Sequence, residues 1–210
     1  MVRSSLLRND NSSLEVFCQS SMSISALAPV LSSNNSQRTF NRRDLIPLRP
    51  DILWKIERGV VRTATWSEEG QQVALGYWGP LDVVGQPLSR VQPYRLECLT
   101  SVEVSLLPPD RWHQALDAIL LQIQQSEELL NIFHQKQVHH RLLQLLIWLA
   151  QKFGRQIEQG QLIELRLTHK EIAEFLGTTR VTVTRSLSQF EQQGIIHRSN
   201  RHLILLQHSV

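Results

Sequence analysis

Short stretches of β-forming residues dominate the chain from Gln37 to Leu107. Val, Ile, Thr and Trp are frequent in these stretches, glycine-containing turns separate them, and no helix-length apolar pattern lies between them. Several short strands at this spacing are typical of a small antiparallel sandwich or barrel. We therefore expect an antiparallel, jelly-roll-like β-roll over residues 37–108, with strands at Ile52–Glu57, Val60–Trp66, Gln72–Trp78, Arg95–Thr100 and Val102–Leu107.

A long helix is predicted after Pro108-Pro109, within residues 109–137, with Asp110 as its N-cap. Its apolar positions recur at alternating steps of three and four residues, which is the seam spacing of a two-stranded coiled coil. The helix either pairs with a second copy of the chain or packs on its own domain, and the pattern alone gives the two equal weight. The seam positions are Leu116, Ile119, Ile123, Ser126, Leu130 and Phe133.

Residues 138–210 mix helical and extended patterns, so the fold class is α+β. His139–Phe153 has one apolar helical face and ends at Gly154, and Gln161–Leu167 alternates like a short strand. The run Thr168-His-Lys-Glu171 has the form of a capping box, in which the Thr and Glu side chains bond each other's backbone amides. A helix must therefore begin at Thr168.

A helix, a tight glycine turn and a second helix follow from this start. Gly177 stands where the first helix would end, and the second helix is predicted from about Arg180 to Gln192. This is the helix-turn-helix pattern. The apolar positions that would meet in its core are Ile172, Ala173, Leu176, Val183, Leu187 and Phe190.

The other face of the second helix carries groups that suit a DNA groove. Arg donates two hydrogen bonds to guanine, Thr bonds base edges or phosphates, and Val and Thr methyls suit a thymine methyl. The alternative is a three-helix core with two surface Arg residues, and the capping box, the glycine and the division of faces weigh against it. The candidate DNA-binding residues of the whole motif, including the start of its first helix and the turn, are Thr168, His169, Thr178, Thr179, Arg180, Val181, Thr182, Thr184, Arg185 and Ser188.

A hairpin with a polar, basic tip is predicted after the second helix. Ile195–Arg198 and His202–Leu206 flank the short run at residues 199–201. A hairpin beside such a helix makes a winged helix, whose tip residues can contact phosphates, although an exposed basic turn is also ordinary. The candidate contacts are Arg198, Asn200 and Arg201.

The charge is concentrated at the same end of the chain. The net charge is +3, and residues 139–210 hold 9 of the 22 Lys and Arg residues against 5 of the 19 Asp and Glu residues. Six of the eight His residues lie there too, and their partial protonation would add positive charge. This asymmetry favours a polyanion as partner.

The rest of the composition narrows the class of protein. Cys18 and Cys98 are too few for a disulfide framework or a cysteine-rich metal site, which favours a reducing cytoplasm. No apolar run approaches the ~20 residues that span a bilayer, so no membrane segment is expected. Residues 1–36 are rich in Ser and Asn and are expected to form a disordered arm, which initiation at Met22 would shorten.

The stretch from Leu167 to Leu187 resembles the C-terminal domain of the Crp/Fnr transcription regulators. Its Thr-Arg-Val-Thr-Val-Thr-Arg run is most similar to the cyanobacterial nitrogen-control regulators, and the resemblance covers about residues 38–207. It implies a cyclic nucleotide-binding-like sensor roll, a dimerisation helix and a winged helix-turn-helix. It also implies a homodimer on an inverted repeat of double-stranded DNA, contact with RNA polymerase, and control of nitrogen or sulfur genes. Many family members have Glu where Val181 stands, so the operator should differ from that of the cyclic AMP receptor.

The resemblance places an effector pocket near Gly85, Gln86, Arg90 and Arg95. Family members that bind cyclic nucleotides use a Glu and an Arg-Ser pair there, and this chain has Gln86-Pro-Leu and no such pair. Cyclic AMP is therefore not expected. Arg90 or Arg95 suits a small carboxylate or phosphate, or is simply a solvated side chain.

Other cofactors and activities find little support. The chain lacks the cysteines of an iron–sulfur sensor, and residues 37–107 contain no His or Met for haem, so no cofactor is expected. Cys98 fits a core residue better than a redox switch, and His134, His139 and His140 fit solvated side chains better than a metal site. No catalytic motif occurs, so an enzyme is not expected. The alternative function is a winged-helix module that binds another protein.

Overall fold

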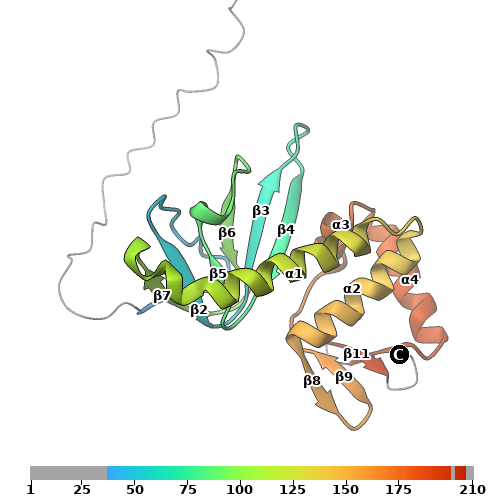
Figure 1. Cartoon of the computed structure of the whole chain (residues 1–210). Helices are drawn as coiled ribbons and strands as arrows, with labels where there is room; N and C mark the ends of the chain where they lie inside the picture. The colour runs from blue at the N-terminus through green and yellow to red at the C-terminus, as the bar shows by residue number, and fades with distance from the viewer. Residues whose placement is uncertain (1–36, 200–201, 207–210) are drawn as a thin grey trace, which may run out of the picture. The chain divides into compact units, whose positions relative to one another are not determined.

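The computed structural model describes residues 37–199 and 202–206 (Figure 1), so the predicted arm at residues 1–36 lies outside the described residues. The first half of the described chain, blue to green in Figure 1, consists of strands joined by short turns. Two strands have the predicted bounds. The strands are β1 (Gln37–Phe40), β2 (Leu53–Arg58), β3 (Val61–Trp66), β4 (Gln72–Trp78), β5 (Val83–Val84), β6 (Arg95–Cys98) and β7 (Val102–Leu107).

These strands form two antiparallel sheets around one core. The strand orders are β1-β7-β2-β5 and β4-β3-β6. Trp54 and Val104 of the first sheet and Val61 and Leu96 of the second are buried in the same apolar cluster. These side chains fill the space between the two sheets. The predicted antiparallel roll is confirmed.

The connection to the second half begins with a 3-10 helix, η2 (Pro109–Ala115), followed by α1 (Leu116–Phe133). The prediction that Asp110 is an N-cap is wrong, because Asp110 lies in the first turn of η2 and α1 begins six residues later. Pro109 presets the backbone for a tight turn, and the Trp112 indole donates to the Leu107 carbonyl oxygen at 3.1 Å. These contacts hold η2 against the roll. A second short 3-10 helix, η1 (Gln86–Leu88), lies within the roll.

The second half combines helices with a small sheet of order β10-β11-β9-β8. The predicted strand at Gln161–Leu167 is shorter in the structure, where β9 ends at Ile163 and one further bond, from the Glu164 amide to the Phe153 carbonyl oxygen at 2.9 Å, closes the pairing with β8. The predicted hairpin is confirmed. The elements are α2 (Val138–Phe153), β8 (Gly154–Ile157), β9 (Gly160–Ile163), α3 (His169–Leu176), α4 (Arg180–Gln192), β10 (Ile196–Ser199) and β11 (His202–Leu206).

The core of the second half lies between α2 and the two helices that follow. Leu142 and Leu145 of α2 are fully buried in one cluster with Ile172 of α3 and Phe190 of α4. Burying side chains of this size contributes about 1.5–3 kcal/mol each, before the cost in entropy. None of the described helices combines the length and the apolar character that crossing a membrane requires.

Charged side chains join the roll to this second half. The Arg62 guanidinium of β3 donates to Glu97 at 2.6 Å and lies 3.9 Å from the Glu174 carboxylate of α3. The Lys152 ammonium of α2 lies 2.8 Å from the Asp82 carboxylate. Burial lowers the pKa of Lys152, and the Asp82 carboxylate opposes this shift. Such buried ion pairs keep the connected elements in contact, because breaking one would leave a buried charge without a partner.

Candidate nucleic-acid interface

The first helix of the motif begins at the predicted capping box. The Thr168 hydroxyl accepts from the Glu171 amide at 3.1 Å, and the Thr168 amide donates to the Glu171 carboxylate at 2.6 Å. The helix ends at Gly177, which has a φ of +61° in the left-handed region that favours glycine. The Thr178 amide then donates to the Ala173 carbonyl oxygen at 2.9 Å and turns the chain toward α4.

We expect Thr168→Ala to destabilise the protein by about 0.5–2 kcal/mol, because it removes the oxygen that satisfies the Glu171 amide. Urea denaturation measures this free energy of unfolding. Thr168→Ser is the matched control, since it keeps the hydroxyl and should lose much less. Equal stability of the Ala variant and the wild type would show that the cap is not needed.

The second helix of the motif, α4, has its own cap and a divided surface. The Thr179 hydroxyl accepts from the Thr182 amide at 3.1 Å, so Thr179 is the N-cap and the helix begins at Arg180. Val183 and Leu187 are fully buried against α3. The predicted division between a core face and a free face is confirmed for this helix.

The free face of α4 presents three side chains to solvent. Arg180 and Arg185 are exposed, and neither guanidinium has a hydrogen bond or ion pair with another described residue. Val181 lies between them with 57% of its surface exposed. Two unpaired guanidiniums and an exposed methyl pair on one helix are groups that can read base edges in a major groove. We call α4 the reader helix.

Two other candidates on the reader helix are engaged within the protein. The Thr184 hydroxyl donates to the Arg180 carbonyl oxygen at 2.9 Å, so its proton is used. Nδ1 of His169 lies 2.8 Å from the same hydroxyl oxygen and therefore donates to it. Ser188 is half-buried, with its hydroxyl 3.5 Å from the Arg198 guanidinium. The Thr184 hydroxyl thus orients the His169 ring, and the Ser188 hydroxyl contacts the Arg198 side chain.

The wing, which is the hairpin of β10 and β11, supplies one more described candidate, Arg198. The candidates Asn200 and Arg201 lie outside the described residues. Arg198 donates from Nε to the Glu191 carboxylate at 2.8 Å, which ties the wing to the end of α4. The Arg198 contact lowers the pKa of Glu191.

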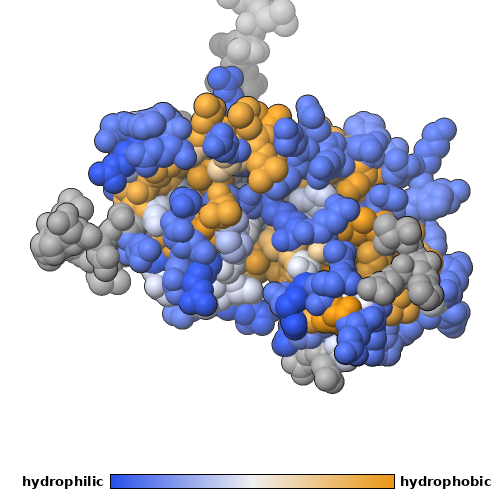
Figure 2. Space-filling model, turned by 60° about the horizontal axis from the view of Figure 1, so that its bottom comes forward, coloured by the Kyte–Doolittle hydropathy of each residue, from blue (hydrophilic) through white to orange (hydrophobic). Residues whose placement is uncertain are grey.

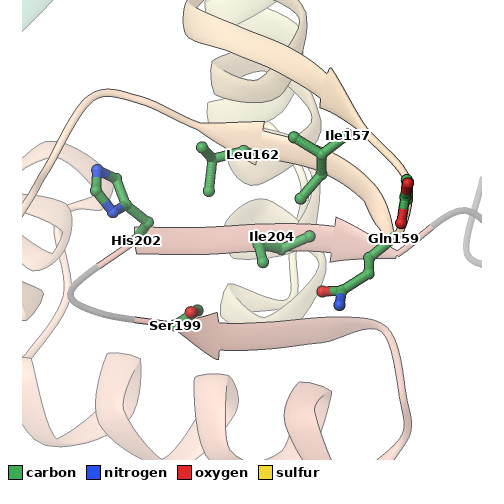
Figure 3. A pocket seen from close by; sticks show the side chains of 7 residues that line it. Ile157, Gln159, Leu162, Ser199, His202 and Ile204 are labelled. Atoms are coloured by element: carbon green, nitrogen blue, oxygen red, sulfur yellow. The ribbon is translucent and has the colours of Figure 1, made fainter.

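A shallow hollow of about 530 Å³ opens on the side of the wing sheet (Figure 3), between Ile157, Glu158, Gln159, Leu162, Ser199, His202 and Ile204.

Sequence reasoning missed two basic residues beside this motif. Arg166 donates from Nε to Nε2 of His202 at 3.0 Å, and both side chains line the same cavity as Thr168 and His169. Arg42 of the roll lines that cavity too. Arg166 stands two residues before the capping box, a position that could have been noticed, whereas nothing in the local sequence links Arg42 to the motif.

The exposed face of α1 differs in part from the predicted seam. Ile119 packs against the roll, and Phe133 lies against Phe175 of α3 with ring centroids 5.2 Å apart, so these two positions serve the protein's own core. Figure 2 shows that apolar surface remains uncovered between polar side chains. The large apolar side chains of α1 that stay about half exposed are Leu116, Leu120, Leu121, Ile123 and Leu130.

The predicted effector residues differ in their surroundings. Gly85 is buried, and a Cβ atom there would lie 2.8 Å from the Ile52 carbonyl oxygen, so the chain passes close to β2. Gln86 is half-buried in η1, and Arg90 is exposed. The guanidinium of Arg95 lies 4.4 Å from the ring centroid of Trp66, a cation–π contact on the surface.

Cys98 and the histidines occupy ordinary structural positions. Cys98 is buried in the roll, where burial raises the pKa of its thiol to about 12. Nδ1 of His134 lies 2.7 Å from the Leu130 carbonyl oxygen, and the His139 ring lies 4.1 Å from that of Phe190. Among the residues that the structure describes, no three His, Cys, Asp or Glu side chains gather as metal ligands would.

Known proteins resemble the chain in sequence over most of its length. A family model described as the Crp-like helix-turn-helix domain matches residues 140–209. Regulatory protein CysR of Synechococcus elongatus is 43% identical over 167 residues, which cover 78% of this chain and 81% of CysR. A global nitrogen regulator of Synechocystis is 31% identical over 157 residues, which cover 66% of this chain and 69% of that protein.

Solved structures share the fold. A transcriptional regulator of the CRP family from Thermus thermophilus has a TM-score of 0.69 at 23% identity and is covered over 92% of its chain. A cyclic nucleotide-binding domain containing protein from Listeria monocytogenes has a TM-score of 0.70 at 14% identity and is covered over 87% of its chain. The alignments cover 81% and 80% of the present chain, respectively.

Proposed function

The chain belongs to the Crp/Fnr family of DNA-binding transcription regulators, and from this premise we propose that it binds an inverted-repeat operator as a homodimer and regulates nutrient genes in the cytoplasm. The observation that carries the proposal is the free face of the reader helix. Arg180, Val181 and Arg185 are exposed there, and the two guanidiniums have no partner among the described residues. No catalytic step is part of this function.

The homodimer is supported by α1. Family regulators act as dimers, and this helix leaves a row of apolar side chains in solvent that a second copy would cover. Leu116, Ile123 and Leu130 are spaced by seven residues, and Leu120 lies beside the same row. That is the spacing at which two parallel helices interlock side chains. Two reader helices related by a two-fold axis would then enter major grooves about one helical turn, ~34 Å, apart.

Regulation of a nutrient pathway is supported by the relatives. One of them is named a global nitrogen regulator, at 31% identity. We extend this to nitrogen or sulfur genes, with RNA polymerase as a further partner of the bound dimer. We also propose that DNA binding does not require cyclic AMP, because Gln86 replaces the acidic side chain and Arg95 already lies on Trp66.

The dependence of DNA affinity on salt tests this function. A dimer that neutralises several phosphates releases counterions, so the logarithm of its affinity should fall steeply and linearly with the logarithm of salt concentration. Fluorescence anisotropy with a labelled duplex measures this slope. A module that binds only another protein would show no saturable DNA binding at 50 mM salt.

The pH dependence of DNA binding provides a separate prediction. Burial and the nearby Arg198 and Arg180 lower the pKa of His169, and Arg42, Arg166 and His202 line the cavity beside it. His169 is therefore neutral at pH 7 in the free protein. Phosphates would raise its pKa again, so DNA binding takes up a proton, and affinity should increase from pH 8 to pH 6 by less than about tenfold per pH unit and protomer.

The His169→Gln variant is the control for this effect, because an amide can donate to Thr184 and does not titrate. We expect its affinity to depend less on pH than that of the wild type. The effect on stability has the opposite sign. The lowered pKa of His169 stabilises the fold at pH values above 6.5, the ordinary pKa of histidine, and this contribution is lost as the pH falls through the folded pKa. Identical pH profiles of the two proteins would remove His169 from the interface.

A further inference from the structure

A basic cavity of about 380 Å³ lies where the start of α3, the wing and a turn of the roll meet. The charged or titratable side chains that line it are all basic, and none of the described residues in its lining carries a carboxylate. Such a lining favours an anion. The lining residues are Arg42, Arg166, Leu167, Thr168, His169, Arg198, His202 and Leu203.

Two acidic side chains that contact lining residues are already engaged. The Glu171 carboxylate accepts the Thr168 amide, and the Glu191 carboxylate is paired with Arg198. Arg166 uses only Nε for its hydrogen bond to His202, which leaves its two terminal nitrogens without a hydrogen bond to the described residues. The start of α3 adds the partial positive charge of a helix N-terminus. The guanidiniums of Arg42 and Arg166 therefore give the cavity positive charge that no described carboxylate compensates.

Arg42 is the contribution of the roll, and its backbone is rigidly held. The Asn41 amide donates to the Asp44 carboxylate at 2.7 Å, and the Asp44 amide donates to the Asn41 carbonyl oxygen at 3.0 Å. The Arg43 amide donates to the Cys98 carbonyl oxygen at 2.7 Å, which fixes the turn to β6. The Arg42 guanidinium itself has no hydrogen bond or ion pair with a described residue. A fixed turn thus presents a free guanidinium to the cavity.

We propose that this cavity binds a phosphate group of the DNA backbone, held by Arg42 of the roll together with Arg166 and the start of α3. The roll would then contact DNA itself. The proposal rests on the proposed function. DNA is favoured over a free phosphate because the same motif carries the reader helix, and the first helix of a helix-turn-helix crosses the DNA backbone while the second lies in the groove. A guanidinium suits a phosphate through paired hydrogen bonds.

The consequence is a physical link between the roll and the operator. The buried contacts of Arg62 with Glu97 and Glu174 hold α3 against the roll. A phosphate bound by Arg42 and by α3 would join the same two parts of the chain from the outside. The roll would contribute to affinity without reading any base, since phosphate contacts position a protein and do not specify sequence.

The test compares Arg42→Gln with Arg43→Gln, which removes the same charge from the adjacent position outside the cavity lining. Anisotropy titrations of the preferred operator at several salt concentrations give the affinity and the salt slope. For Arg42→Gln we expect the slope to fall by about 2 per dimer, one phosphate contact per protomer. We also expect weaker binding at low salt, unchanged base preference and an unchanged melting temperature. Arg43→Gln should keep the wild-type slope, and Arg42→Lys should restore most of it.

Each outcome has a defined meaning. Sequence-specific binding by the wild type, with equal slopes for Arg42→Gln and Arg43→Gln, would overturn the phosphate contact and leave the proposed function intact. Absence of DNA binding by the wild type would overturn both. Calorimetric titration with inorganic phosphate and pyrophosphate, without DNA, tests whether the cavity binds a free anion instead of a DNA phosphate. Binding tighter than about 1 mM that Arg42→Gln abolishes would assign the cavity to a free anion and contradict the DNA assignment.

Discussion

Replacing Ile123 by Glu should convert the protein from a dimer to a monomer at micromolar concentration. Ile123 is at the middle of the row formed by Leu116, Ile123 and Leu130, and 52% of its surface is exposed in the single chain. In a dimer the new carboxylates would face each other across an apolar contact, where an unpaired charge is costly. Sedimentation equilibrium measures the change directly.

Loss of the dimer should also reduce operator affinity strongly. Two linked half-site contacts gain about 10²–10⁴-fold over one through effective concentration, and the monomer loses this gain. Preference for the half-site sequence should remain, because the reader helix is untouched. Gln124→Glu is the matched control, since it adds the same charge to the next residue of α1, away from the row. A dimeric Ile123→Glu protein would show that the chain associates through another surface.

The second large effect is expected for Arg180→Ala and Arg185→Ala. A bidentate contact between Arg and guanine is worth about 1–3 kcal/mol, and a dimer on an inverted repeat makes it twice. Each variant should therefore lose roughly 2–6 kcal/mol of operator affinity, because contacts at separate base pairs are close to additive. Each should also lose its preference at one base pair in every half-site.

Arg155→Ala is the control for this prediction, because Arg155 is exposed on β8, paired with Glu164 and distant in sequence from the reader helix. It removes the same charge and should change the salt dependence little and the base preference not at all. Competition with single-base operator variants gives the preference at each position. If Arg180→Ala or Arg185→Ala keeps both affinity and preference, α4 is not the reader helix.

The parts of this structure that could be predicted are those fixed by local chemistry. The capping box at Thr168 and the left-handed glycine at position 177 set the ends of α3 to the residue. The strands Gln72–Trp78 and Val102–Leu107 follow from runs of β-forming residues that end at Gly79-Pro80 and at Pro108-Pro109. The free face of α4 follows from the burial of Val183 and Leu187 at helical spacing.

The parts that could not be predicted depend on contacts between distant segments. The exposed strand β1 has no buried face and forms only through pairing with β7. η2 replaces the expected start of the long helix because Trp112 and Ala115 pack on the roll. Phe133 fits a coiled-coil seam by spacing, yet it packs on Phe175, whose position is known only once α3 is folded. Arg42 lies far in sequence from the cavity that it lines.

Selection from random duplex DNA by the purified protein, without added ligand, tests the central claim most directly. Sequencing of the retained duplexes should yield an inverted repeat whose half-site centres are about 10 base pairs apart, with guanines at positions that change in the Arg180→Ala and Arg185→Ala proteins. Repeating the selection with 2-oxoglutarate and with cyclic AMP covers binding that depends on a ligand. Absence of any enriched sequence under all three conditions would contradict the assignment of this chain as a sequence-specific regulator.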